Sequence, residues 1–372
     1  MKEENLNEES DPISPSRRSF IQMAGALLPI FLANPFNLFR SLTSPDGELR
    51  PVPRPKPNRF VQDGKALVGV VGGENIDRMV REAVDLIGGI DRLDLKGKTV
   101  LVKPNVVSHN PPPATTNPEV VRSVVKLLYE GGAGKVIVGD MSGVIRLPTR
   151  KNLKETGIEA AAREAGAEVI DFDDAEWIEV KPPQAQLSGK IYVARPVYEA
   201  DLLVNVPVVK THQSATYSIC LKNLVGVTHP RNRPYRVNPA RWEEVVAEMN
   251  LAAHPDLNIV DATTIMVAGG PQEGPAEKTN MIFASGDRIA ADVVGLGLIK
   301  HFNRWKGVGE ISVWAQRQIR YAQTIGLGVK EAASMKMIAK RLEGDEAVFS
   351  ALIAKIESAL AEGPGKDKPP SP

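Results

Sequence analysis

Side chains suited to binding and converting a small anion occur in four separate segments of the chain. They are Lys103, Asn105, Asp140, Lys210, His212, Lys222, Asn223 and Asp261. Lysines hold phosphate or carboxylate groups as point charges, and asparagine amides both donate and accept hydrogen bonds. The sequence therefore predicts a site in which the lysines and asparagines bind an anionic substrate. His212, with Asp140 or Asp261, would be the catalytic acid–base pair.

His212 is the residue on which the catalytic hypothesis depends. Lys210, two residues earlier, disfavours a protonated imidazole, whereas a carboxylate from a neighbouring strand end favours it. Opposed influences of this kind keep the pKa of a histidine near neutrality, where a general base works best. We therefore expect His212 to reach Asp140 or Asp261, directly or through one water molecule or metal ion.

A metal site is an alternative use of the same segments. His109, His212 and His229 each lie near a candidate lysine, and three imidazoles with an aspartate would form a plausible metal site. No His-x-x-x-His spacing occurs, and isolated histidines in loops are more often simply hydrogen-bonded. The single cysteine, Cys220, excludes an internal disulfide and a cysteine-ligated iron–sulfur cluster within this chain.

The elements that must position these residues alternate between short apolar strands and amphipathic helices. Strands are expected at 66–71, 99–102, 135–138, 168–170, 202–206, 257–260 and 281–284. Such alternation predicts an α/β fold, with a doubly wound, mostly parallel sheet, helices on both faces and a helical C-terminal addition. In these sheets ligands bind beyond the carboxyl ends of the strands, where most of the candidate residues lie.

Helix boundaries are marked by their own signals. Asn75 and Asn117 are placed to cap helices, and Pro118 follows at the first helical position. A glycine-rich stretch at 69–73 lacks the spacing of a dinucleotide fingerprint. A second, Gly269-Gly270-Pro271 with Gly274, predicts tight turns that need positive φ angles.

The N-terminal segment has the features of an export signal. Arg17 and Arg18 precede an apolar run of about 11 residues, which is shorter than the roughly 20 that a spanning helix needs. The arginine pair followed by Ser-Phe-Ile resembles a twin-arginine signal. We expect export by the twin-arginine machinery to the periplasm. An uncleaved leader would instead anchor the protein on the outer side of the inner membrane.

These signals divide the chain into five segments. They are a signal or anchor at 1–44, a proline-rich linker at 45–65, the α/β domain at 66–305, C-terminal helices at 306–361 and a disordered tail at 362–372. Lysine plus arginine totals 46 and aspartate plus glutamate totals 45, which gives a formal net charge of +1. That balance argues against nucleic acid as a partner, because nucleic-acid binders carry a strongly basic face.

Several motifs together resemble the domain of unknown function 362 family. They are Val102-Lys103-Pro104-Asn105, Thr116-Asn117-Pro118, Gly139-Asp140, the run from Val206 to His212, the run from Lys222 to Gly226, Gly269 to Gly274, and Ala284 to Asp287 with Ala290, Ala291 and Asp292. The resemblance covers roughly residues 66–298. It implies no known reaction. Members of the family are often joined to cluster-binding modules, an association that this one-cysteine chain does not share.

Three functions are consistent with these residues. The first is an exported enzyme that acts on a small anionic substrate at the carboxyl ends of the strands. The second is a metal- or anion-binding protein without catalysis, and the third is an accessory subunit of a redox system. An enzyme should pair a perturbed titratable group with a pocket, whereas an accessory subunit should expose an apolar patch.

Overall fold

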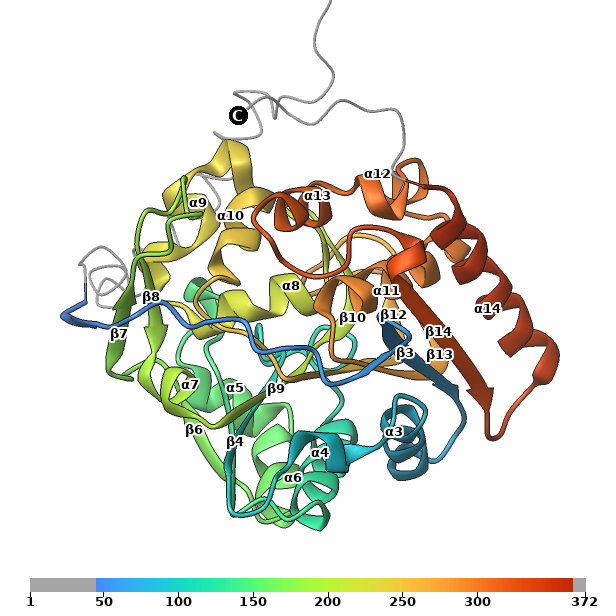
Figure 1. Ribbon diagram of the computed structural model, residues 1–372, viewed down its shortest axis with the longest axis horizontal. Helices are drawn as coiled ribbons and strands as arrows, with labels where there is room; N and C mark the ends of the chain where they lie inside the picture. Colours follow the sequence, from blue (N-terminus) through green and yellow to red (C-terminus); the bar gives the residue numbers. More distant parts are fainter. Residues whose placement is uncertain (1–44, 364–372) are drawn as a thin grey trace, which may run out of the picture.

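A computed structural model describes residues 45–363, and its centre is an 11-stranded sheet. In spatial order the main strands are β14 (Met335–Arg341), β3 (Lys65–Gly72), β13 (Ala276–Ser285), β12 (Leu257–Met266), β9 (Leu202–Val206), β4 (Thr99–Pro104), β5 (Lys135–Asp140) and β6 (Glu168–Asp171). Three short strands complete the sheet, namely β2 (Val61–Gln62), β10 (Val208–His212) and β11 (Thr216–Ser218). Figure 1 shows the C-terminal β14 lying beside the N-terminal β3.

The strand directions confirm the predicted fold class. Strands β12, β9, β4, β5 and β6 are mutually parallel, and β14 runs parallel to β3, while β13 is antiparallel to both of its neighbours. Side chains of β4 alternate between two hydrophobic cores, with Val100 and Val102 in one and Leu101 in the other. Because each core is closed by its own helices, both faces of the sheet are covered.

The helices divide between these two cores. One core receives α3 (Ile76–Asp85), α4 (Pro118–Glu130) and α6 (Ile158–Glu164). The other receives α10 (Trp242–Met249), α11 (Arg288–Phe302) and α14 (Glu346–Ala361). The remaining helices are short: α5 (Thr149–Glu155), α7 (Arg195–Glu199), α8 (Cys220–Asn223), α9 (Pro234–Val237), α12 (Lys306–Gly309) and α13 (Arg317–Thr324).

The predicted helix starts are confirmed. The side chain of Asn117 accepts a hydrogen bond from the backbone N–H of Glu119, and Pro118 occupies the first turn of α4. Asn75 caps α3 in the same way. Asp287 accepts from the N–H groups of Ile289 and Ala290 at the start of α11. Each cap provides an acceptor for N–H groups that have no partner within the helix.

Two segments differ from the expected elements. Part of the range 306–361, expected to be helical, forms the strand β14, because Met335–Arg341 pairs with the free edge of β3 over seven residues. The range expected to be a linker contains β1 (Gly47–Leu49), which pairs with β7 (Trp177–Val180). With β8 (Ile191–Ala194), these two strands form a separate three-stranded sheet that the sequence did not predict.

A proline separates two consecutive strands, β9 and β10, next to the predicted site residues. Strands β9 and β10 are separated only by Pro207, and both run parallel to β12. The Pro207 carbonyl accepts a hydrogen bond from the N–H of Asp261. Proline cannot donate to the sheet, so the chain bends here and β10 leaves the path of β9.

The predicted export signal, with Arg17 and Arg18, lies outside the described residues, as does most of the expected tail. Among helices within residues 45–363, none is both long and apolar enough to cross a membrane.

Candidate functional site

At the carboxyl ends of the central strands the structure brings together six of the predicted residues, namely Lys103, Asn105, Asp140, Lys210, Lys222 and Asn223. Lys103 and Asp140 end β4 and β5, and Asn105 follows β4 directly. Lys210 and His212 belong to β10 rather than to a loop, and they are buried. Lys222 and Asn223 lie on α8, in which every residue except Lys222 is buried.

Lys103 and Asp140 form a buried ion pair. Their Nζ and Oδ1 atoms are 2.7 Å apart, and the side chains are 1% and 2% exposed. The ammonium also donates to Asn223 Oδ1 and to the Pro104 carbonyl, which uses all three of its protons. Asp140 in turn accepts from the N–H groups of Val106 and Met141. Burial lowers the pKa of Lys103, and the charge of Asp140 opposes that shift.

Lys210 is equally buried but has no carboxylate partner. Its ammonium donates to Asn105 Oδ1 at 2.8 Å and to the carbonyls of Ala114 at 2.5 Å and Pro271 at 3.2 Å. Burial, followed by the charges of Lys222 and Lys103, holds the pKa of Lys210 well below its usual range. All three N–H donors of Lys210 therefore have acceptors, but no carboxylate balances its positive charge.

A chain of asparagine amides crosses the sheet beneath these lysines. Asn223 Oδ1 accepts from Asn105 Nδ2, and its own Nδ2 donates to Asn205 Oδ1 on β9. Asn205 Nδ2 then donates to Asn258 Oδ1 on β12. Neither Asn205 nor Asn258 is among the residues predicted from the sequence. The available signal was an asparagine inside each of two otherwise apolar strands, a position that requires buried partners.

Lys222 differs from the other two lysines because its Nζ has no hydrogen bond or ion pair within the described part of the chain. The side chain keeps a small exposed fraction, although its ammonium lies among buried groups. Burial lowers the pKa of Lys222 to about 7, and the charges of Arg233 and Lys103 act in the same direction. The charge of Asp140 opposes them.

Arg233 is a functional candidate that the sequence analysis missed. It precedes α9 in the segment Pro230-Arg231-Asn232-Arg233-Pro234, which follows no strand of the main sheet. The residue is 6% exposed, yet its Nε and Nη2 atoms have no hydrogen-bond partner. Burial lowers the pKa of Arg233, while Asp140 and Asp173 raise it. We call Lys103, Lys210, Lys222 and Arg233 the cationic cluster.

His212 does not form the expected direct contact with a carboxylate. Its Nδ1 accepts a hydrogen bond from the N–H of Ser214 at 3.2 Å, and its ring lies 6.4 Å from that of Trp242. Burial, Lys222 and Lys210 together hold its pKa well below the ordinary value, so the expected pKa near neutrality is wrong. A neutral ring whose Nδ1 accepts carries its proton on Nε2, which makes it a donor rather than a base.

Asp261 is separate from the lysines in its contacts. Its carboxylate accepts from the N–H of Asn117 at 2.8 Å and from the N–H and hydroxyl of Thr263. These bonds tie β12 to the start of α4, and burial raises the pKa of Asp261. Asp261 holds neighbouring backbone in place and does not contact His212, because nearby donors already occupy its carboxylate oxygens.

The histidines do not converge on a metal site. His109 is exposed, whereas His229 is buried with its Nδ1 accepting from the N–H of Arg231 and its ring edge-on to Trp177 at 4.9 Å. Within residues 45–363 there is no group of three histidine, cysteine, aspartate or glutamate side chains placed to hold a metal ion.

Glycines and a buried carboxylate fix the walls of the site. A Cβ on Gly226 would overlap the Asp140 carboxylate and the Lys103 ammonium, so only glycine admits this pair. Gly269 and Gly270 have φ angles of +74° and +80°, which confirms the predicted turns. The carboxylate of Asp292 accepts from the N–H groups of Cys220 and Leu221 and thereby anchors the start of α8, which carries Lys222.

Comparison with known sequences places these residues in one family. The family model described as Domain of unknown function (DUF362) matches residues 100–297, which is more than half of the chain. The chain belongs to this family. All four residues of the cationic cluster lie within the matched segment. The chain is also 26% identical, over 222 residues, to a thylakoid-associated protein of Synechocystis sp., covering 58% of this chain and 67% of that protein.

Two solved structures resemble the family fold more distantly. One is the lactate racemase apoprotein from Thermoanaerobacterium thermosaccharolyticum, with 18% identity, a TM-score of 0.40 and coverage of 64% of this chain and 59% of that one. The other is a Thermotoga maritima protein, with 16% identity, a TM-score of 0.36 and coverage of 58% and 56%. This chain therefore spans less than two thirds of either solved chain.

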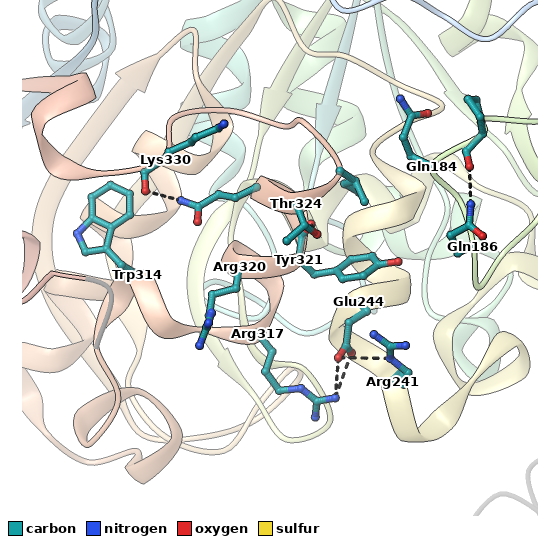
Figure 2. A pocket seen from close by; sticks show the side chains of 13 residues that line it. Gln184, Gln186, Arg241, Glu244, Trp314, Arg317, Arg320, Tyr321, Thr324 and Lys330 are labelled. Atoms are coloured by element: carbon teal, nitrogen blue, oxygen red, sulfur yellow. Dashed lines mark hydrogen bonds and ion pairs between the residues drawn. The ribbon is translucent and has the colours of Figure 1, made fainter. Parts of the chain in front are cut away.

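A large cavity lies apart from the cationic cluster, partly beyond the family segment. It has a volume of about 1070 Å³ and is lined mainly by α10, α13 and the segment 183–186. Figure 2 shows Glu244 between Arg241 and Arg317 on one wall of this cavity. The guanidinium groups of Arg241 and Arg317 therefore have carboxylate partners, unlike that of Arg233.

Proposed function

We propose that this protein is an exported enzyme that acts on a small anionic substrate, and that Lys222 and Arg233 bind the anionic group. The observation that supports this most directly is the Arg233 guanidinium, which is buried with two unpartnered nitrogens beside an unpaired amine. Buried charged groups are normally paired, because removing a charge from water is costly. A bound anion would supply the missing partner.

The geometry of the donors favours an oxyanion. A guanidinium presents its N–H groups as a planar fork that matches the two oxygens of a carboxylate or phosphate. The Lys222 amine adds one further donor, and the cluster as a whole has four cationic side chains around Asp140. Catalysis, rather than binding alone, is suggested by Lys222, whose pKa of about 7 allows proton exchange at neutral pH.

Calorimetric titration tests the anion site. Inorganic phosphate and pyruvate should each bind the full chain. Replacing the guanidinium in Arg233→Gln should weaken binding at least about tenfold, the effect of losing a charged hydrogen bond. Arg317→Gln is a matched control, because it removes a paired arginine from the separate cavity. Equal affinity in all three proteins, or binding by none of them, would contradict the proposal.

Export is a separate part of the proposal. Replacing the guanidinium groups in the double variant Arg17→Lys with Arg18→Lys should block passage through the twin-arginine machinery, because a lysine cannot reproduce the guanidinium fork. Fractionation of a tagged chain measures this. Recovery of wild-type protein with the inner membrane would indicate an anchored leader, and recovery in the periplasm a cleaved one. Unchanged export of the variant would eliminate the assignment.

A further inference from the structure

We propose that Lys222 is a nucleophile that forms an imine with the carbonyl carbon of a 2-oxo acid whose carboxylate is bound by Arg233. This inference rests on the proposed function, because it assigns a substrate class and a reaction to the same site. It depends on three features of the described residues, namely a free amine, a cationic environment and an open guanidinium.

The amine of Lys222 is the available one among the three clustered lysines. Lys103 and Lys210 each donate to three acceptors, so their nitrogens are enclosed by partners. Lys222 Nζ has no such partner within the described part of the chain. Its side chain is also the only one of the three that is partly exposed to solvent.

The surroundings of Lys222 favour the neutral, nucleophilic form of the amine. The charge of Lys222 lowers the pKa of Lys210 and of His212, and Arg233 lowers the pKa of Lys222 itself. Lys222 is therefore within electrostatic range of Lys210, His212 and Arg233. With a pKa of about 7, near half of the molecules carry a neutral amine at pH 7. Neighbouring cations and desolvation are the usual means of activating a nucleophilic lysine.

The guanidinium of Arg233 sets the class of carbonyl compound. Its Nε and Nη2 atoms are adjacent donors that lack acceptors, which is the arrangement that a carboxylate fills. In a 2-oxo acid the carbonyl carbon is bonded directly to the carboxylate. Binding of that carboxylate beside Lys222 therefore holds the electrophilic carbon near the amine, whereas a neutral ketone lacks this contact.

The reaction balances without an oxidant or a second reactant. The lone pair of neutral Lys222 Nζ attacks the carbonyl carbon, a C–N bond forms, and the C=O π electrons move to oxygen. One N–H proton is transferred to that oxygen, which gives a carbinolamine. A proton from solvent then converts the hydroxyl to a leaving water molecule, the C–O bond breaks, and the nitrogen lone pair forms the C=N bond of a protonated imine.

Borohydride trapping tests the inference on the full chain. The protein is incubated with pyruvate at pH 7 to 8, reduced with sodium borohydride and examined by intact-mass and peptide mass spectrometry. We expect one adduct per chain, on the peptide containing Lys222, with a mass gain equal to that of pyruvate less one oxygen atom. Lys222→Arg should lose the adduct while retaining the charge. Lys181→Arg, a change at a lysine that is 58% exposed, should keep it.

The adduct yield in a second variant tests the role of Arg233. Arg233→Gln should lower the adduct yield with dilute pyruvate at least about tenfold, since a charged hydrogen bond to the carboxylate is lost. Methyl pyruvate lacks that carboxylate charge, so its adduct yield should change little in the same variant. Circular dichroism of each variant checks that the fold is retained.

The outcomes separate this inference from the proposed function. Pyruvate or phosphate binding by calorimetry without any trapped adduct would overturn the imine and leave the anion site intact. An adduct on Lys222 that is unaffected by Arg233→Gln or by excess phosphate would contradict the anion site. Labelling spread over exposed lysines, equal in Lys222→Arg, would overturn the assignment of Lys222 as nucleophile.

Discussion

Two regions of the molecule hold arginines in different ways. In the cavity between α10 and α13, Arg317 Nη2 donates to both oxygens of Glu244, at 2.8 and 3.1 Å, although its Nε lacks an acceptor. In the cationic cluster, neither Nε nor Nη2 of Arg233 has a partner, and the residue is 6% exposed. Arg317 is 35% exposed, so water can reach it.

The difference shows why the larger space is not the better candidate site. The cavity of about 1070 Å³ offers room, but an anion that binds Arg241 or Arg317 there must compete with the carboxylate of Glu244. The cationic cluster offers positive charge that the fold itself leaves uncompensated. Low local polarity strengthens an interaction with an incoming anion, since buried charges are poorly screened. Unmatched charge, rather than volume, therefore favours the cationic cluster as the candidate site.

The largest effect on stability is expected from Asp140→Asn. This change removes the charge that pairs with Lys103 at 2.7 Å and leaves a buried ammonium uncompensated. Breaking a buried pair in this way costs about 3–5 kcal/mol. Urea unfolding at pH 7 measures it.

The pH dependence of the stability lost in Asp140→Asn tests the same ion pair independently. Without Asp140, the pKa of Lys103 in the folded state falls further below its unfolded value. The unfolded chain then binds more protons, and the variant should regain stability as the pH rises. A loss under about 1 kcal/mol at pH 7 would mean that the cluster does not depend on this pair.

A change in the pH dependence of stability is expected from Lys222→Met, which removes a titrating group from the cluster. In the folded protein the pKa of Lys222 is about 7, below its value in the unfolded chain. The unfolded state therefore binds more protons between about pH 7 and 10, and this residue makes stability rise with pH by up to about 1.4 kcal/mol per unit. The variant should lose that slope. Lys181→Met, at an exposed lysine, should keep it.

The sequence predicted the convergence of Lys103, Asp140 and Lys210 because the topology of a parallel sheet determines it. Residues that end neighbouring strands must lie at one edge, and β4, β5 and the β9–β10 segment are neighbours or continuations of neighbours. Arg233 could not be predicted in this way, since it follows no strand of that sheet. Only tertiary packing brings its segment over the strand ends.

The other differences between the predicted and the observed structure also have specific physical causes. The sequence predicts a helix where β14 forms, because the apolar residues of this segment, among them Met335 and Ile338, also fit a helical spacing. Its pairing with the edge of β3 connects residues more than 250 positions apart, which no local pattern reports. His212 was assigned a carboxylate partner because strand ends carried aspartates. The backbone N–H groups that occupy Asp140 and Asp261 cannot be read from residue types.

The smallest effect is expected in the cavity itself. Glu244→Gln keeps a side-chain oxygen that can accept from Arg317, and Glu243 remains 3.5 Å from the same guanidinium. Glu244 itself is buried, but Arg317 and Arg241 are 35% and 24% exposed, so water compensates for part of the lost charge and the expected cost is about 1–2 kcal/mol. Urea unfolding and phosphate titration should show a slightly weaker fold and unchanged anion affinity. A loss as large as that of Asp140→Asn would mean that partial exposure does not distinguish the two regions, and the comparison would fail.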